Sequence, residues 1–174
     1  MPTILVVDDD ELVLSALRST LLREKYEVFA AAGPEEGLKV LKEHAVDIVI
    51  SDHMMPKMTG IEFLKLVRDR HPGVGRILLT GMADKETAIK AVNEAEIYRF
   101  LEKPWDATAL KVIVHLALEQ VEQERCNRVL LAIVRRQGDF LRDLQAQNPG
   151  IFRVDRDIDG AIVLSEEELG ALAV

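Results

Sequence analysis

The sequence predicts an α/β fold in which helices cover both faces of a five-stranded parallel sheet. Short apolar segments indicate buried strands, and the segments between them repeat apolar residues at steps of three and four, as amphipathic helices do. The two kinds alternate through residues 1–121. Apolar strands linked by helices form parallel sheets that are buried on both faces, and right-handed crossovers make such a sheet doubly wound.

Local signals place each element along the chain. Asp10 is a good N-cap for the helix that follows the first strand, because its carboxylate can accept a free backbone N–H. Pro34 suits the first turn of the second helix, and His71-Pro72-Gly73 ends the third. The predicted strands cover residues 3–7, 26–30, 47–51, 76–80 and 98–101, and the predicted helices cover residues 11–25, 34–43, 60–70, 84–94 and a last one from 106.

Length and composition exclude several other kinds of protein. The 174 residues fit one domain and a remainder too short for a second, since about 150 residues per domain is usual. A net charge of −8 disfavours general nucleic-acid binding, which needs a basic surface. The single cysteine, Cys126, fits a reducing compartment. No apolar run approaches the roughly 20 residues that span a bilayer, and no secretory signal is visible, so we expect a cytoplasmic protein.

Charged and hydroxyl side chains stand where four of the predicted strands end. They are Asp8-Asp9-Asp10 after the first strand, Ser51-Asp52 at the third, Thr80-Gly81 at the fourth and Lys103-Pro104 at the fifth. Ligands of doubly wound sheets bind at this edge. Clustered carboxylates repel one another unless a cation neutralises them, and an oxygen-only ligand set favours a hard cation such as Mg²⁺. The lysine and the threonine are suited to holding phosphoryl oxygens.

These motifs, together with Met55-Pro56-x-Met58-x-Gly60, carry a resemblance to a known family. Residues 1–121 closely resemble the receiver domain of bacterial two-component response regulators, in residue type, strand position and order. The resemblance implies a flavodoxin-like strand order of 2-1-3-4-5. Residues 97–105 resemble receivers joined to HD-GYP cyclic-di-GMP phosphodiesterases or to enhancer-binding regulators, but the motifs of those output domains are absent from the 174 residues.

The resemblance implies a role for each site residue, with Mg²⁺ as cofactor. Asp52 would accept a phosphoryl group from the phosphohistidine of a histidine kinase. The metal ligands would be Asp9 directly, Asp8 through water, Asp52, and the backbone carbonyl of Met54. Lys103 would bridge to a phosphoryl oxygen, Thr80 would hydrogen-bond the phosphoryl group, and Gly81 would leave room beside it. Pro104 would follow a cis peptide bond.

Thr80 and Phe100 would form the family's switch pair, with Phe100 turning inward as Thr80 moves toward the phosphoryl group. A plain core role for Phe100 is the alternative. Output would pass through helix 4, strand 5 and helix 5, that is, residues 84–94, 98–101 and 106–118. Met54 and Met82 flank the pocket with apolar side chains, which favours slow hydrolysis of the phosphoryl group. Such a protein phosphorylates and dephosphorylates only itself, and is not an enzyme acting on metabolites.

Two other functions fit parts of the pattern. A haloacid-dehalogenase-type phosphatase also places a strand-ending Asp, a Thr and a Lys around Mg²⁺, and Asp8-x-Asp10 resembles its first motif. That family needs a further acidic pair after the lysine, which is absent from a strand here, and Asp52 precedes Thr80 as a receiver requires. The other alternative is a phosphorylation-independent dimeric scaffold that acts through the last helix. The sequence identifies neither the kinase nor the downstream protein.

The last helix continues beyond the receiver-like part. Residues 106–147 contain no proline and a single glycine, which predicts one helix with residues 122–148 as an extension. A weak heptad runs through Val112, Leu116, Glu119, Gln123, Cys126, Leu130, Ile133, Gln137, Phe140 and Leu144. Either this helix pairs with a second copy, giving a homodimer, or it folds back on its own domain. The surface of helix 4, strand 5 and helix 5 is a second possible dimer contact.

Residues 149–174 form a short tail with two open interpretations. Apolar segments flank Asp159-Gly160, which indicates a β-hairpin or a partly ordered tail. Asp155, Asp157, Asp159 and Glu166 also have the spacing of an EF-hand calcium loop. Against calcium, the loop stands alone and Pro149-Gly150 breaks the helix that should enter it.

Overall fold

The computed structural model describes residues 1–81 and 97–148. The predicted helix at 84–94, Met82, and the tail at 149–174 lie outside the described residues. Two compact units are distinguished along the chain, Met1–Asn127 and Arg128–Val174. The first unit contains the sheet and all of the predicted site residues that the structure describes.

Five parallel strands form the sheet, in the order β2-β1-β3-β4-β5. They are β1 (Thr3–Val7), β2 (Glu27–Ala31), β3 (Ile48–Asp52), β4 (Gly75–Gly81) and β5 (Arg99–Lys103). The predicted fold class and strand order are therefore confirmed. β5 runs two residues further than predicted, because Glu102 and Lys103 stay in register with Thr80 and Gly81 of β4. That extension brings Lys103 to the carboxyl edge of the sheet.

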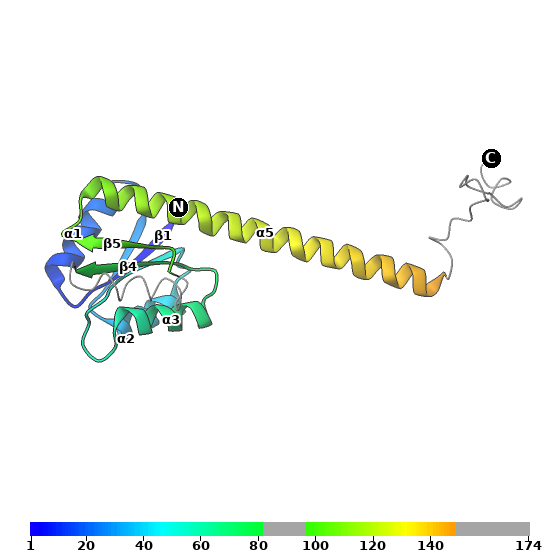
Figure 1. The fold of residues 1–174 in the computed structure, drawn as a ribbon, viewed down its shortest axis with the longest axis horizontal. Coiled ribbons are helices and arrows are strands. Elements are labelled where there is room, and N and C mark those ends of the chain that lie inside the picture. The colour runs from blue at the N-terminus through cyan, green and yellow to red at the C-terminus, as the bar shows by residue number, and fades with distance from the viewer. Residues whose placement is uncertain (82–96, 149–174) are drawn as a thin grey trace, which may run out of the picture. The chain divides into compact units, whose positions relative to one another are not determined.

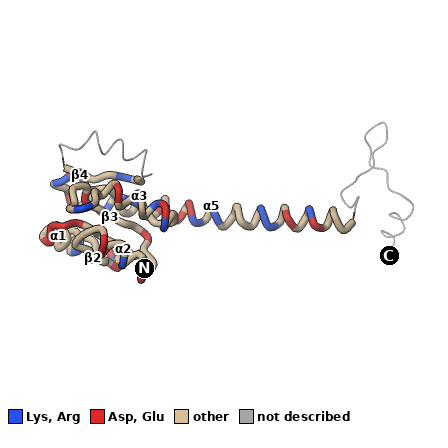
Figure 2. Tube along the Cα trace, turned by 90° about the horizontal axis from the view of Figure 1, so that it is seen from below, with Lys and Arg blue, Asp and Glu red and all other residues tan. Residues whose placement is uncertain are grey.

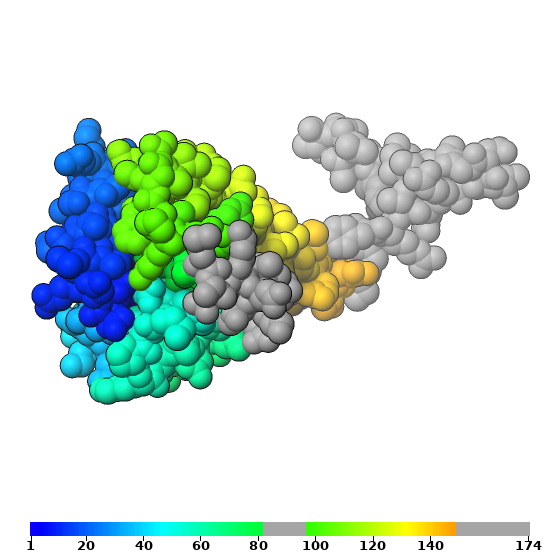
Figure 3. Space-filling view, turned by 60° about the vertical axis from the view of Figure 1, so that its left-hand side comes forward, coloured from blue at the N-terminus to red at the C-terminus, as the bar shows by residue number. Residues whose placement is uncertain are grey.

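Helices cover both faces of the sheet (Figure 1). They are α1 (Glu11–Leu22), α2 (Pro34–Glu43), α3 (Gly60–Arg70) and α5 (Ala107–Gln147). On one face, Leu17 of α1 and Leu110 and Val114 of α5 pack on β-strand residues in one buried cluster. On the other face, α2 and α3 contribute Leu41 and Phe63 to a second cluster. Figure 3 shows the amino-terminal segments in blue and the first turns of α5 in green meeting on one surface of this unit.

The ends of the helices follow from local chemistry. Asp10 caps α1 as predicted, accepting the Leu12 N–H at 2.8 Å. α1 ends at Leu22, three residues earlier than predicted, because Lys25 adopts a φ of 60° and its N–H bonds the Leu22 carbonyl. A positive φ cannot continue a right-handed helix.

α5 is one helix of 41 residues, as the uninterrupted sequence predicted. It starts after Asp106, whose carboxylate accepts the N–H groups of Thr108 and Ala109. None of the helices that the structure describes is both long enough and apolar enough to cross a membrane.

Candidate functional site

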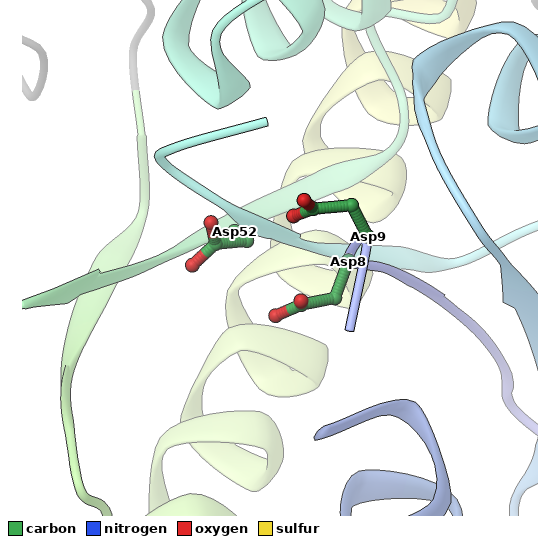
Figure 4. A group of neighbouring side chains, drawn as sticks. All are labelled: Asp8, Asp9 and Asp52. Atoms are coloured by element: carbon green, nitrogen blue, oxygen red, sulfur yellow. The ribbon is translucent and has the colours of Figure 1, made fainter. Parts of the chain in front are cut away.

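Three carboxylates meet at the carboxyl edge of the sheet. Asp8 and Asp9 follow β1, and Asp52 is the last residue of the neighbouring strand β3. One oxygen from each lies within 4.8 Å of the others, and Figure 4 shows the three side chains directed into a shared space. Asp8 and Asp52 are buried, whereas Asp9 is exposed. The sequence predicted this grouping, because neighbouring parallel strands end at the same edge.

Lys103 joins the two buried carboxylates. Its Nζ lies 2.7 Å from Asp8 Oδ2 and 2.5 Å from Asp52 Oδ1. Burial lowers the pKa of the Lys103 ammonium, but its hydrogen bonds to Asp52 and Asp8 outweigh burial and leave that pKa above its ordinary value. Lys103 is therefore a fixed positive charge in the site, held by two residues more than fifty positions away in sequence.

Backbone N–H groups hold the other oxygen of each buried carboxylate. The Asp10 N–H donates to Asp8 Oδ1 at 2.9 Å, and the Met54 N–H donates to Asp52 Oδ2 at 2.8 Å. Both side chains are therefore held between one amide and the Lys103 ammonium. This arrangement fixes the direction in which Asp52 presents its oxygens before any ligand arrives, which is the positioning that phosphoryl transfer needs.

The negative charge of the site exceeds what Lys103 can neutralise. Burial raises the pKa of Asp8, although the hydrogen bonds from Lys103 and Asp10 oppose that rise. Three carboxylates face one ammonium, so a divalent cation would balance the charge, and an oxygen-only donor set suits Mg²⁺. Asp8, Asp9 and Asp52 fit such an ion. The carbonyl of Met54 remains a predicted ligand.

Thr80 and Phe100 occupy neighbouring strands beside the carboxylates. Thr80 is fully buried at the end of β4, and its hydroxyl donates to the Gly81 carbonyl at 3.3 Å. Phe100 on β5 is partly buried and packs against the cluster beneath α2 and α3. Movement of this pair remains a prediction. The Lys103-Pro104 bond is cis, as expected.

The sequence did not show how closely the chain packs behind Asp52. A Cβ on Gly60 would lie 1.8 Å from the Asp52 carbonyl oxygen, so only glycine fits. The Ser51 hydroxyl donates to the same carbonyl at 2.9 Å. Gly60 stands in the Met-Pro-x-Met-x-Gly motif, and that motif was the only sequence signal for the close approach. Gly60 and Ser51 thus support the backbone of Asp52 from behind.

Residues 4–115 match the family model of the response regulator receiver domain. This chain belongs to the response regulator receiver family. The match covers the sheet, the three carboxylates and Lys103, and confirms the resemblance seen in the motifs. Receivers of this family are phosphoacceptor signalling domains.

Curated relatives of this receiver include transcriptional regulators. The hydrogenase transcriptional regulatory protein HoxA of Cupriavidus necator is 41% identical over 117 residues, which is 67% of this chain and 24% of HoxA. The transcriptional regulatory protein GlrR of Escherichia coli K12 is 37% identical over 142 residues, covering 82% of this chain and 32% of GlrR. The chain thus spans about a quarter to a third of the length of these relatives.

Solved receiver structures share the fold over most of this unit. The signal receiver domain of an HD domain-containing protein from Pseudomonas fluorescens Pf-5 is 38% identical, with a TM-score of 0.67, and the match covers 70% of this chain and 98% of that one. A receiver domain from Clostridium thermocellum is 31% identical, with a TM-score of 0.67, over 71% of this chain and 98% of that one. The predicted similarity to receivers of HD-domain proteins and of transcriptional regulators is confirmed.

Proposed function

We propose that this receiver takes a phosphoryl group from a histidine kinase onto Asp52 and signals through protein contacts. The supporting observation is the position of Lys103, whose ammonium lies within hydrogen-bonding distance of Asp52 and Asp8 while Asp9 completes an acidic set beside them. Positioning and charge neutralisation are the main needs of phosphoryl transfer, and this site provides both.

The proposed reaction is an in-line displacement at phosphorus. An oxygen of Asp52 forms the new P–O bond, the P–N bond of the kinase phosphohistidine breaks, and the leaving imidazole keeps the electron pair and takes a proton. Bound Mg²⁺, held by Asp8, Asp9 and Asp52, would neutralise charge on the phosphoryl oxygens. Lys103 would hold one of those oxygens, and the buried Thr80 hydroxyl would donate to another.

The output proposal follows from the same site. When Thr80 turns toward the phosphoryl group, it gives up the Gly81 carbonyl, and Phe100 on the next strand moves into the space that Thr80 leaves. The change would reach partners through β5 and the first turns of α5. A cytoplasmic location and self-association of the chain belong to the same proposal.

A phosphorylation-independent scaffold is the second candidate, favoured by the exposed apolar residues of α5. Intact-mass measurement after incubation with acetyl phosphate separates the two. We expect one added phosphoryl group only when Mg²⁺ is present, and none on the Asp52→Ala variant. Asp106→Ala, which alters an acid at the start of α5, is the matched control and should take up phosphoryl normally. No uptake by a folded wild-type protein from either acetyl phosphate or a phosphorylated kinase would favour the scaffold.

A further inference from the structure

The second part of α5 carries a broad apolar face that no described residue covers. Between Arg128 and Gln147, seven large apolar side chains are 47–63% exposed, and all but Leu131 lie on one face of the helix. Those on this face are Val129, Leu130, Ile133, Val134, Phe140 and Leu141. Helices in proteins are stabilised mainly by the packing of such a face, so we expect this one to have a partner.

Arginines mark the opposite side of the same helix. Arg128, Arg135 and Arg142 follow one another at intervals of seven residues, which keeps them on one line along the helix. With about 100° per residue, this line lies opposite the apolar face. Figure 2 shows the charged positions as blue and red bands among uncharged ones. Copies of this helix could therefore bring their apolar faces together while the arginine lines stay in water.

The apolar face is wider than the seam of a two-stranded coiled coil. In heptad terms, the a and d positions are Leu130, Ile133, Gln137, Phe140, Leu144 and Gln147, and the two glutamines are the polar ones. The flanking e positions, Val134 and Leu141, are both apolar and widen the face on that side. On the other side, the g positions are Val129 and the charged Arg136 and Asp143. A two-stranded coil buries a and d alone, whereas a helix in a bundle also buries e or g, because it touches two neighbours.

The identities at the a and d positions point the same way. Leucine occupies a at Leu130 and Leu144, and a β-branched residue occupies d at Ile133. β-branched residues at a with leucine at d favour two strands, whereas leucine at a with isoleucine at d shifts the preference to three or four. Closed assemblies of two or four copies are commoner than those of three. Four is therefore the number that satisfies both trends.

We propose that four copies of this chain associate through residues 128–147 of α5 as a four-helix bundle. The proposal rests on the proposed self-association of the chain, and it names the number of copies and the residues that bring them together. It does not depend on the chemistry of Asp52, because none of the bundle residues belongs to the phosphoacceptor site.

Light scattering of the full chain after size-exclusion chromatography measures the mass of the assembly and so the number of chains in it. The measurement is made under reducing conditions, with and without acetyl phosphate and Mg²⁺. We expect a mass four times the 19.5 kDa of the chain in at least one of these conditions. A mass of one, two or three chains in both conditions would overturn the proposal.

Exchanging leucine and isoleucine between a and d positions tests whether these residues set the number of chains. The triple change Leu130→Ile, Ile133→Leu and Leu144→Ile exchanges isomeric side chains, so it keeps the size of the face but places β-branched residues at positions 130 and 144 and leucine at position 133. We expect its mass to fall from four chains to two. Leu131→Gln removes an equally exposed apolar side chain that lies outside the face, and should keep four chains. Loss of the four-chain mass in Leu131→Gln, with its retention in the exchange, would contradict the assigned face.

Phosphoryl uptake by the same samples separates this inference from the proposed function. The exchange variant should still take up one phosphoryl group, because its receiver is unchanged. Uptake by a monomeric wild-type protein would contradict the bundle alone, whereas a four-chain mass without uptake would contradict the phosphoacceptor proposal alone.

Discussion

Asp8 illustrates how individual residues of the site oppose stability. Its burial raises its pKa above the ordinary value of 3.8, so the folded protein holds the Asp8 proton more tightly than the unfolded chain does. The protonated Asp8 side chain stabilises the folded protein fully when the pH is below 3.8. This contribution to the free energy of unfolding is lost as the pH rises through the raised pKa of Asp8. At neutral pH, ionised Asp8 therefore lowers the free energy of unfolding. The proposed function requires the charge, because Asp8 would help to hold Mg²⁺.

Asp8→Asn should therefore stabilise the metal-free protein while removing its response to Mg²⁺. We expect the free energy of unfolding at pH 7 in a chelator to rise by about 0.5–2 kcal/mol, the usual size of a single stabilising substitution, because the buried charge is removed. Addition of Mg²⁺ should raise the melting temperature of the wild type much more than that of the variant. Urea unfolding and thermal melts measure both effects. A less stable variant in chelator would show that Asp8 is held favourably.

Gly60→Ala should be among the most damaging single-methyl changes in the receiver. The new Cβ would stand 1.8 Å from the Asp52 carbonyl oxygen, which is backbone and cannot rotate away. We expect the free energy of unfolding to fall by at least about 3 kcal/mol, or Asp52 to be displaced so that the protein no longer takes up phosphoryl groups. Gly138→Ala is the matched control, since nothing lies within 4 Å of its new Cβ and alanine favours a helix by about 1 kcal/mol. Equal stability of the two variants would contradict the close approach.

Lys57 carries backbone strain in the loop between β3 and α3. Its φ of 69° lies in the left-handed region, which glycine and asparagine adopt at low energetic cost and lysine does not. Lys57→Gly should stabilise the protein by roughly 0.5–1 kcal/mol. Lys57→Ala removes the exposed ion pair with Glu35 but keeps the strain, so it should change little. The urea midpoints of the two variants measure the difference. If Lys57→Ala stabilised the protein as much as Lys57→Gly, the backbone at Lys57 would not be strained.

At the scale of elements, Asp47 links α5 to the amino edge of the sheet. Its Oδ2 accepts the Thr3 N–H at 2.8 Å, and its Oδ1 lies 2.7 Å from Arg125 of α5. At the preceding residue of α5, the Tyr98 hydroxyl donates to the Glu124 carboxylate at 2.5 Å. These contacts hold α5 near residue 125, close to the end of the first compact unit at Asn127.

Asp47→Ala should release this end of the helix. We expect the free energy of unfolding to fall by about 1–2 kcal/mol, because the buried Thr3 N–H loses its acceptor and Arg125 loses its ion pair. Amide exchange should quicken at residues 121–127 while residues 107–117 stay protected. Asp139→Ala, which breaks the exposed pair with Arg142 on the same helix, should cost almost nothing. Unchanged exchange at 121–127 in Asp47→Ala would contradict this role.

The sequence predicted the alternation of elements, the Asp10 cap and the meeting of acids at one sheet edge, because these follow from local periodicity and from the geometry of parallel strands. It did not predict that α1 ends at Leu22, before the turn at Lys25, since a lysine gives no sign of a positive φ. Nor did it predict the contact between Asp47 and Arg125, because the two residues are 78 positions apart and only the assembled sheet brings them together. The close approach of Gly60 to Asp52 depends on how the loop between β3 and α3 folds back, with the Gly60 N–H bonded to the His53 carbonyl, and the sequence did not show that path.

For the whole molecule, we propose that the acidic site makes this chain a phosphoacceptor. The chain spans about a quarter to a third of the transcriptional regulators HoxA and GlrR, and the receiver domain lies within the part that it shares with them by sequence. The proposed bundle of α5 helices would hold four copies of this receiver in one assembly. The two claims concern separate residues and can be tested separately.

The most direct test locates the phosphoryl group itself. Phosphorylated protein is reduced with borohydride, which converts an aspartyl phosphate to homoserine, and tandem mass spectrometry then finds the altered residue. We predict homoserine at position 52 only, and only when Mg²⁺ was present during phosphorylation. Homoserine at position 8, 9 or 10 instead, or at none of the aspartates of a protein that had gained phosphoryl mass, would contradict the account.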